Sequence, residues 1–133
     1  MSTRSYIGEL YNDGSVLFIY CHFDGYPEHH LPILNENYDT PEKVQELLAL
    51  GNISVLAPRV APNPDENHSF DHPVSGVVIA YHRDRGEELE TCTARSRKEF
   101  EKYVDDSVSY GYLFEESTGE WICYDPYEER GLS

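Results

Sequence analysis

Two segments of the chain place a histidine two residues before an aspartate, at the end of an apolar run. His22 and Asp24 follow the most apolar run of the sequence, and His82 and Asp84 follow a second one. Residues two apart on an extended strand point to the same side. If the two strands were neighbours, the imidazoles and carboxylates would suit a divalent transition metal that activates water for hydrolysis.

A second interpretation of the same segments needs no ligand. Gly25 and Gly86 each follow an Asp within two residues. An Asp in such a turn accepts backbone hydrogen bonds, and the His then packs beside its strand. The chain has no tight ligand spacing such as His-Glu-x-x-His, which favours this structural interpretation.

Arg83 and Arg85 flank the second aspartate and are two of only ten basic residues. Arginines can clamp a phosphate or carboxylate bidentately, which would suit an anionic ligand or a small signalling nucleotide. The alternative is an ion-pair network with neighbouring carboxylates. No Gly-rich phosphate loop accompanies them, so nucleotide binding lacks its usual support.

The other histidines form two further groups. His68 and His72 lie four residues apart around Asp71, but the proline-rich surroundings predict a loop rather than a chelating helix. His29 and His30 are adjacent at an expected helix start, where solvent exposure is the simpler interpretation.

The cysteines favour packing over catalysis. Cys21 precedes His22 on a strand, where adjacent residues point to opposite faces, so the two cannot pair as nucleophile and base. Cys21, Cys92 and Cys123 form no Cys-x-x-Cys motif, which excludes a structural zinc ribbon. Reduced thiols in a cytosolic protein fit best.

The net charge of -15 arises from 25 acidic and ten basic residues. This balance excludes a simple nucleic-acid binder, which needs a basic patch for phosphates, and an anionic membrane would repel the protein. The same charge would steer the protein towards basic partners. It is also what a soluble, acidic protein without such a partner would show.

The C-terminal third combines acids with tyrosines. An acidic, tyrosine-rich surface could occupy a nucleic-acid-binding groove on a partner protein, with carboxylates in place of phosphates. The alternative is a solvated acidic face. The residues expected to form the binding surface are Tyr103, Asp105, Asp106, Glu115, Glu116 and Tyr127.

The local patterns predict an α+β fold in the order ββ-αα-loop-β-α-ββ. We expect one domain over residues 1–133, with a mainly antiparallel sheet of about five strands and about three helices. Turn residues and apolar runs predict the strands, and capping residues and helical periodicity predict the helices. The strands are expected at 6–11, 15–21, 77–81, 110–114 and 121–124, and the helices near 31–38, after Thr40 and after Ser96.

The composition of residues 57–76 predicts a long proline-rich loop. Loops of this length in compact domains are usually functional or disordered. There is no apolar signal core and no 18-residue apolar run. The protein is therefore expected in the cytoplasm, as a monomer or small homo-oligomer.

Several motifs together resemble a family of small uncharacterised proteins of tailed bacteriophages and prophages. They are Tyr20-Cys21-His22-Phe23-Asp24-Gly25-Tyr26-Pro27, Pro41-Glu42-Lys43-Val44, Leu48-Ala49-Leu50-Gly51-Asn52-Ile53-Ser54 and Arg83-Asp84-Arg85-Gly86-Glu87-Glu88. The resemblance covers nearly the whole chain and implies an accessory protein acting in the bacterial host cytoplasm. The resemblance assigns no catalytic residues to this chain.

The leading hypothesis is an interaction protein without catalytic residues or a cofactor. It would bind and inhibit a host defence or nucleic-acid-processing protein through a basic surface of that protein, without touching nucleic acid or membrane. The alternative is a small hydrolase, with a divalent transition metal, or an anionic-ligand or nucleotide-binding protein. That alternative would use His22, Asp24, His82, Arg83, Asp84 and Arg85.

Overall fold

In the computed structural model, which describes residues 3–126, strand β2 (Val16–Cys21) lies at the centre of a mixed sheet. One edge of β2 pairs with β1 (Ser5–Leu10), and the other edge is shared by β5 (Cys92–Ala94) and β3 (Ile53–Val55). The unbroken apolar run of β2 is typical of a strand in this central position. The remaining strands are β4 (Ile79–Ala80), β6 (Tyr110–Glu115) and β7 (Glu120–Tyr124), and the order is β4-β3-β2-β1-β6-β7 with β5 beside β2.

The α+β class is confirmed and most strand pairs are antiparallel, but the sheet is mixed, and the expected five strands and three helices are too few. The described residues form seven strands and four helices, and the pairs β1–β6 and β2–β3 are parallel. The two helices between β2 and β3 carry the chain from the end of β2 back to the end of the sheet at which β2 begins, so β3 runs parallel to β2, and the helix between β5 and β6 does the same for those two strands. Strands β3, β4 and β5 have only two or three residues, too few to show a periodic pattern.

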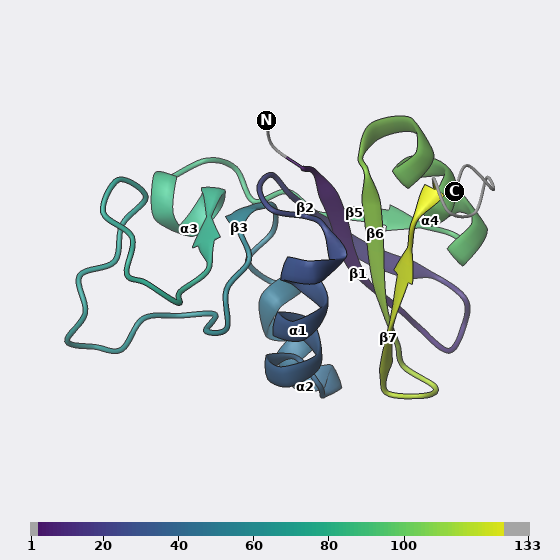
Figure 1. The fold of residues 1–133 in the computed structure, drawn as a ribbon, viewed down its shortest axis with the longest axis horizontal. Helices are drawn as coiled ribbons and strands as arrows, with labels where there is room; N and C mark the ends of the chain where they lie inside the picture. The colour runs from purple at the N-terminus through teal and green to yellow at the C-terminus, as the bar shows by residue number, and fades with distance from the viewer. Residues whose placement is uncertain (1–2, 127–133) are drawn as a thin grey trace.

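Helices cover both faces of the sheet (Figure 1). Helices α1 (Pro27–Asn37) and α2 (Pro41–Leu48) pack on one face, and α4 (Arg97–Ser107) packs on the other. The larger core cluster lies under α1 and α2, and Phe100 and Val104 of α4 belong to the smaller one. Both faces of β2 are therefore buried, which explains its continuous apolar run.

The first hairpin turns at Asp13 and Gly14, as its sequence predicts. Gly14 has a φ of 92°, which a residue with a Cβ rarely adopts. Asp13 Oδ1 accepts hydrogen bonds from the backbone N–H and the hydroxyl of Ser15, at 2.9 and 2.6 Å. These bonds fix the register of β1 against β2.

The predicted helix starts at Thr40 and Ser96 are confirmed. Thr40 Oγ1 accepts from Lys43 N–H at 3.3 Å, and Ser96 Oγ accepts from Glu99 N–H at 3.1 Å. The first helix begins at Pro27, earlier than the expected start near residue 31, so Pro32 lies inside α1.

The second apolar run does not continue as a strand. Helix α3 (Tyr81–Arg85) begins directly after β4 and ends at Gly86, whose φ is 75°. His82 and Asp84 therefore lie on a helical turn and not on an extended strand, which corrects the expectation. The two apolar runs resemble each other in sequence but fold differently.

The segment 57–76 lies between β3 and β4 and, as predicted, contains no regular element beyond the isolated bridge from Arg59 to Val77. In Figure 1 it extends with α3 to one side of the sheet. No helix among residues 3–126 is both long and apolar enough to cross a membrane.

Candidate functional site

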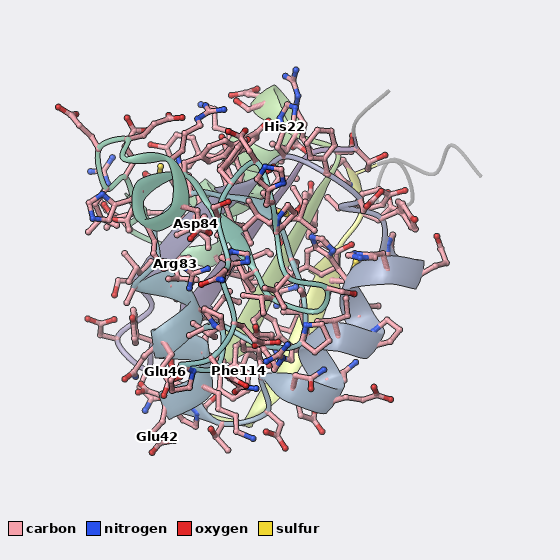
Figure 2. All side chains as sticks on the ribbon, turned by 90° about the vertical axis from the view of Figure 1, so that its left-hand side faces the viewer. His22, Glu42, Glu46, Arg83, Asp84 and Phe114 are labelled. Carbon is pink, nitrogen blue, oxygen red and sulfur yellow. The ribbon has the colours of Figure 1, made fainter. Side chains whose placement is uncertain are left out.

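The two His-x-Asp pairs do not form one site. Strand β3 separates β2 from β4, and Figure 2 shows His22 apart from Asp84. His22 Nδ1 lies 2.7 Å from the Tyr20 hydroxyl, and His82 Nδ1 lies 2.7 Å from the carbonyl oxygen of Glu87. Within residues 3–126, no group of three or more His, Cys, Asp or Glu side chains could hold a metal ion. The expected transition-metal site requires the two His-x-Asp pairs to converge, and they do not.

Asp84 instead forms a buried polar network with the long loop. Its Oδ2 lies 3.1 Å from His68 Nε2 and accepts from the backbone N–H of Ala80 at 2.8 Å. Arg83 donates to both carboxylate oxygens, at 2.8 and 3.0 Å. Burial alone would raise the pKa of Asp84, but these bonds outweigh it and hold the pKa below its usual value.

The polar groups of this network are already paired. The Val74 N–H donates to His68 Nδ1 at 3.0 Å, so Nε2 carries the proton that points at Asp84. Arg83 also donates to the carbonyl oxygens of Val60 and Val78. Arg83 and Asp84 thus link residues 60–74 to β4 and α3. The bond from the Ala80 N–H to Asp84 is of the kind that the structural interpretation expects.

Arg85 has a different environment from Arg83. Its guanidinium carbon lies 4.5 Å from the ring centroid of Phe70 and 5.0 Å from that of Tyr81. It also forms an ion pair with Glu87. Arg83 and Arg85 thus each pair with a neighbouring carboxylate, and the cation–π contact with Phe70 holds this part of the long loop against α3.

A buried Ser–His pair lies where β1 meets α1. Ser5 Oγ is 3.1 Å from His30 Nε2, and the two Nδ1 atoms of His29 and His30 are 3.0 Å apart. Ser5 and His30 are both fully buried. Burial, followed by the neighbouring His29, lowers the pKa of His30 to about 3. Because His30 is buried, the expectation that both histidines are exposed to solvent is wrong for His30. Its neutral imidazole packs in the core and cannot contact a substrate.

Cys21 is an inert core thiol, in agreement with its prediction from strand geometry. It is fully buried, and burial raises its pKa to about 12. The thiolate, which is the reactive form, is therefore scarce.

The predicted binding surface is divided in two. Tyr103, Asp105 and Asp106 lie on α4, where the Tyr124 hydroxyl donates to Asp105 at 2.9 Å. Tyr124 lies opposite Gly111 of β6 in the sheet. Glu115 lies four residues beyond Gly111 on β6, which is about 13 Å at the usual rise of a strand. Tyr127 lies outside the described residues.

The α4 part of this surface is close to neutral. Residues 95–106 contain four basic and four acidic side chains. Arg95 pairs with Glu99 at 3.2 Å, and Arg97 pairs with Glu101 at 3.1 Å. Such a mixed surface attracts a basic partner weakly.

The Glu115–Glu116 part belongs to a more acidic region. Glu116 Oε1 accepts from Asn12 N–H at 2.9 Å, which joins the two hairpin turns. Trp121 Nε1 donates to the carbonyl oxygen of Tyr38 at 2.8 Å, which joins β7 to the α1–α2 connection. Figure 2 shows Glu42 and Glu46 of α2 near Phe114 at this end of the molecule. We call this region the acidic end: it comprises Asp13, Glu42, Glu46, Glu115, Glu116 and Glu120.

Only one basic residue lies in the segments that form the acidic end. Lys43 is the only lysine or arginine within residues 11–15, 38–48 and 115–120, and it pairs with Asp39 at 3.4 Å. The acidic end therefore carries a concentrated negative charge, whereas α4 does not.

Sequence reasoning missed Glu9, which lies beneath the acidic end. Its side chain is fully buried on the α1–α2 side of the sheet. The signal was present: Glu9 follows Ile7 at the two-residue spacing of a strand, and Ile7 is a core residue. A carboxylate at a core-facing position is rare unless it has a partner.

Comparisons of the chain with protein-family models, curated proteins and solved structures find no match.

Proposed function

We propose that this protein is a non-enzymatic interaction protein whose acidic end binds a basic surface on another protein. The supporting observation is the concentration of carboxylates on α2 and both hairpin turns, against the single Lys43. Partners with nucleic-acid-binding grooves offer such a basic surface, and carboxylates would stand where phosphates bind. Inhibition of that partner would follow from occupation of its groove.

The polar groups around the second His-x-Asp segment have partners within the fold. Arg83, Asp84 and His68 bond one another and the backbone, and Cys21 and His30 are buried. The acidic end groups several carboxylates beside a single lysine, which suits a positively charged partner. This arrangement supports binding rather than chemistry.

The test compares two double variants with the same net charge. Glu46→Lys with Glu120→Lys alters the acidic end, and Asp71→Lys with Asp106→Lys alters exposed positions elsewhere. Tagged proteins are incubated with bacterial lysate at low and high salt, and bound proteins are identified by mass spectrometry. We expect a nucleic-acid-binding protein that is retained by the wild type and the control, released by salt and lost with the acidic-end variant.

A second measurement tests the inhibition. The captured protein is purified, and its nucleic-acid affinity is measured with and without the wild-type chain. Competition is expected from the wild type and not from the acidic-end variant. Equal retention by both double variants would refute the assignment to the acidic end.

A further inference from the structure

Glu9 is a fully buried carboxyl group without a hydrogen-bond partner. Its two oxygens are the only buried side-chain nitrogen or oxygen atoms in residues 3–126 that lack one. It lies opposite Leu17 of β2 and Phe114 of β6 in the sheet. An unsatisfied buried polar group costs free energy, so its presence calls for an explanation.

The charged and titratable neighbours of Glu9 are acids and a phenol. Glu116 approaches from the end of β6, and Tyr11 follows β1. Gln45 of α2 contributes an amide, and Leu17 and Phe114 contribute apolar side chains. The polar ends of Gln45 and Tyr11 approach Glu9 and lower its pKa, less than burial raises it, but neither makes a well-formed hydrogen bond to its oxygens. No positively charged residue is among the groups in residues 3–126 that act on Glu9, so the two carboxylates lack a counter-charge there.

We propose that Glu9 anchors an arginine side chain of the basic partner, whose guanidinium displaces the Gln45 and Tyr11 side chains and pairs with Glu9 and Glu116. This inference rests on the proposed function and names the group that the acidic end recognises. A guanidinium has five donors in a planar fork, which suits two carboxylates better than an ammonium does. Gln45 is exposed and Tyr11 is half-buried, so both can move without disturbing the core.

Proton release should accompany this binding. Burial raises the pKa of Glu9, and the neighbouring Glu116 raises it further. A guanidinium between the two carboxylates would lower that pKa, because an opposite charge favours the ionised form. At a pH where part of the population holds that proton, binding should expel it.

The test uses hexa-arginine as the probe, with isothermal titration calorimetry at about pH 5 in two buffers that differ in ionisation enthalpy. We expect the wild type to release protons on binding. Glu9→Gln should abolish this release and weaken binding by about tenfold or more near pH 7. Asp71→Asn, which removes an exposed carboxylate outside the acidic end, should keep both the affinity and the proton release.

A measurement on the wild type covers the case in which Glu9→Gln does not fold. The side-chain carboxyl ¹³C shift of Glu9 is titrated against pH with and without hexa-arginine, and its apparent pKa should fall when the peptide is present. An unchanged pKa, or equal affinity and proton release in wild type and Glu9→Gln, would overturn the anchor.

The two proposals fail in different ways. If hexa-arginine binding is lost in the Glu46→Lys, Glu120→Lys variant but does not depend on Glu9, the proposed function stands without the anchor. If the charge-reversed variant binds as well as the wild type, or the wild type does not bind, both proposals fail.

Discussion

His68 and Asp84 meet in a buried pair: the Nε2 of His68 lies 3.1 Å from Oδ2 of Asp84, and their side chains are 1% and 4% exposed. The two residues come from different parts of the chain, the long proline-rich segment and helix α3. Their contact ties a segment with no regular structure of its own to the edge of the sheet. The segment is therefore ordered by a few polar bonds rather than by a helix or strand.

Asp84→Asn should destabilise the protein by about 2–3 kcal/mol, because it leaves the partly buried Arg83 without its counter-charge. Urea denaturation measures the change, and limited proteolysis should show faster cleavage within residues 61–73. Asp71→Asn, at an exposed position in the same segment, is the control and should remain within about 0.5 kcal/mol of wild type. An unchanged urea midpoint for Asp84→Asn would contradict the role of the network.

Glu9→Gln should stabilise the isolated protein near neutral pH, by an amount on the order of 1 kcal/mol. The folded-state pKa of Glu9 is raised above its ordinary 4.5, so its contribution to stability is present below about pH 4.5 and is lost as pH rises through the raised value. Urea melts at several pH values should show a gap between variant and wild type that widens with pH. A gap independent of pH would mean that Glu9 does not titrate in this range. Combined with weaker hexa-arginine binding, a stability gain would identify Glu9 as a residue kept for binding.

His30 should make the protein sensitive to acid. Its pKa is lowered from 6.5 to about 3, so its contribution to stability is present above about pH 6.5 and is lost as pH falls towards 3. The expected loss is about 2–3 kcal/mol at about pH 4.5. Glu9 acts in the opposite direction, so the titration is best measured in the Glu9→Gln background.

The comparison for this prediction is His30→Gln in the same background. It keeps a polar side chain next to Ser5 but cannot take up a proton, so its stability should depend less on pH between about 6.5 and 4.5. Equal pH dependence with and without His30 would contradict the prediction.

The cysteines should differ in their reactivity. Cys92 is exposed, whereas Cys21 is fully buried with a pKa of about 12. A thiol reagent near neutral pH should label Cys92 in the native protein and Cys21 only after unfolding in urea. Mass spectrometry of the labelled peptides identifies each site, with Cys92→Ser as the control. Rapid labelling of Cys21 in the native protein would show that the core around β2 opens readily.

Several local features were predictable because they depend on neighbouring residues. The Asp13–Gly14 turn, the caps at Thr40 and Ser96, and the closing hairpin at 110–124 all follow from short-range sterics and hydrogen bonding. The central position of β2 followed from its unbroken apolar run.

Long-range pairing decided the rest. The sequence alone could not show that β3 separates β2 from β4, so it could not tell that the two His-x-Asp pairs stay apart. The partnership of His68 with Asp84 also depends on how the long segment returns to the sheet.

For function, the sequence determined the large negative charge and the absence of a recognisable catalytic motif, since both are properties of composition and spacing. Only the tertiary structure decided where that charge is concentrated. It brings α2 and two hairpin turns to one end of the sheet and leaves Glu9 buried beneath them, because strand register and helix packing join residues that are distant in the chain.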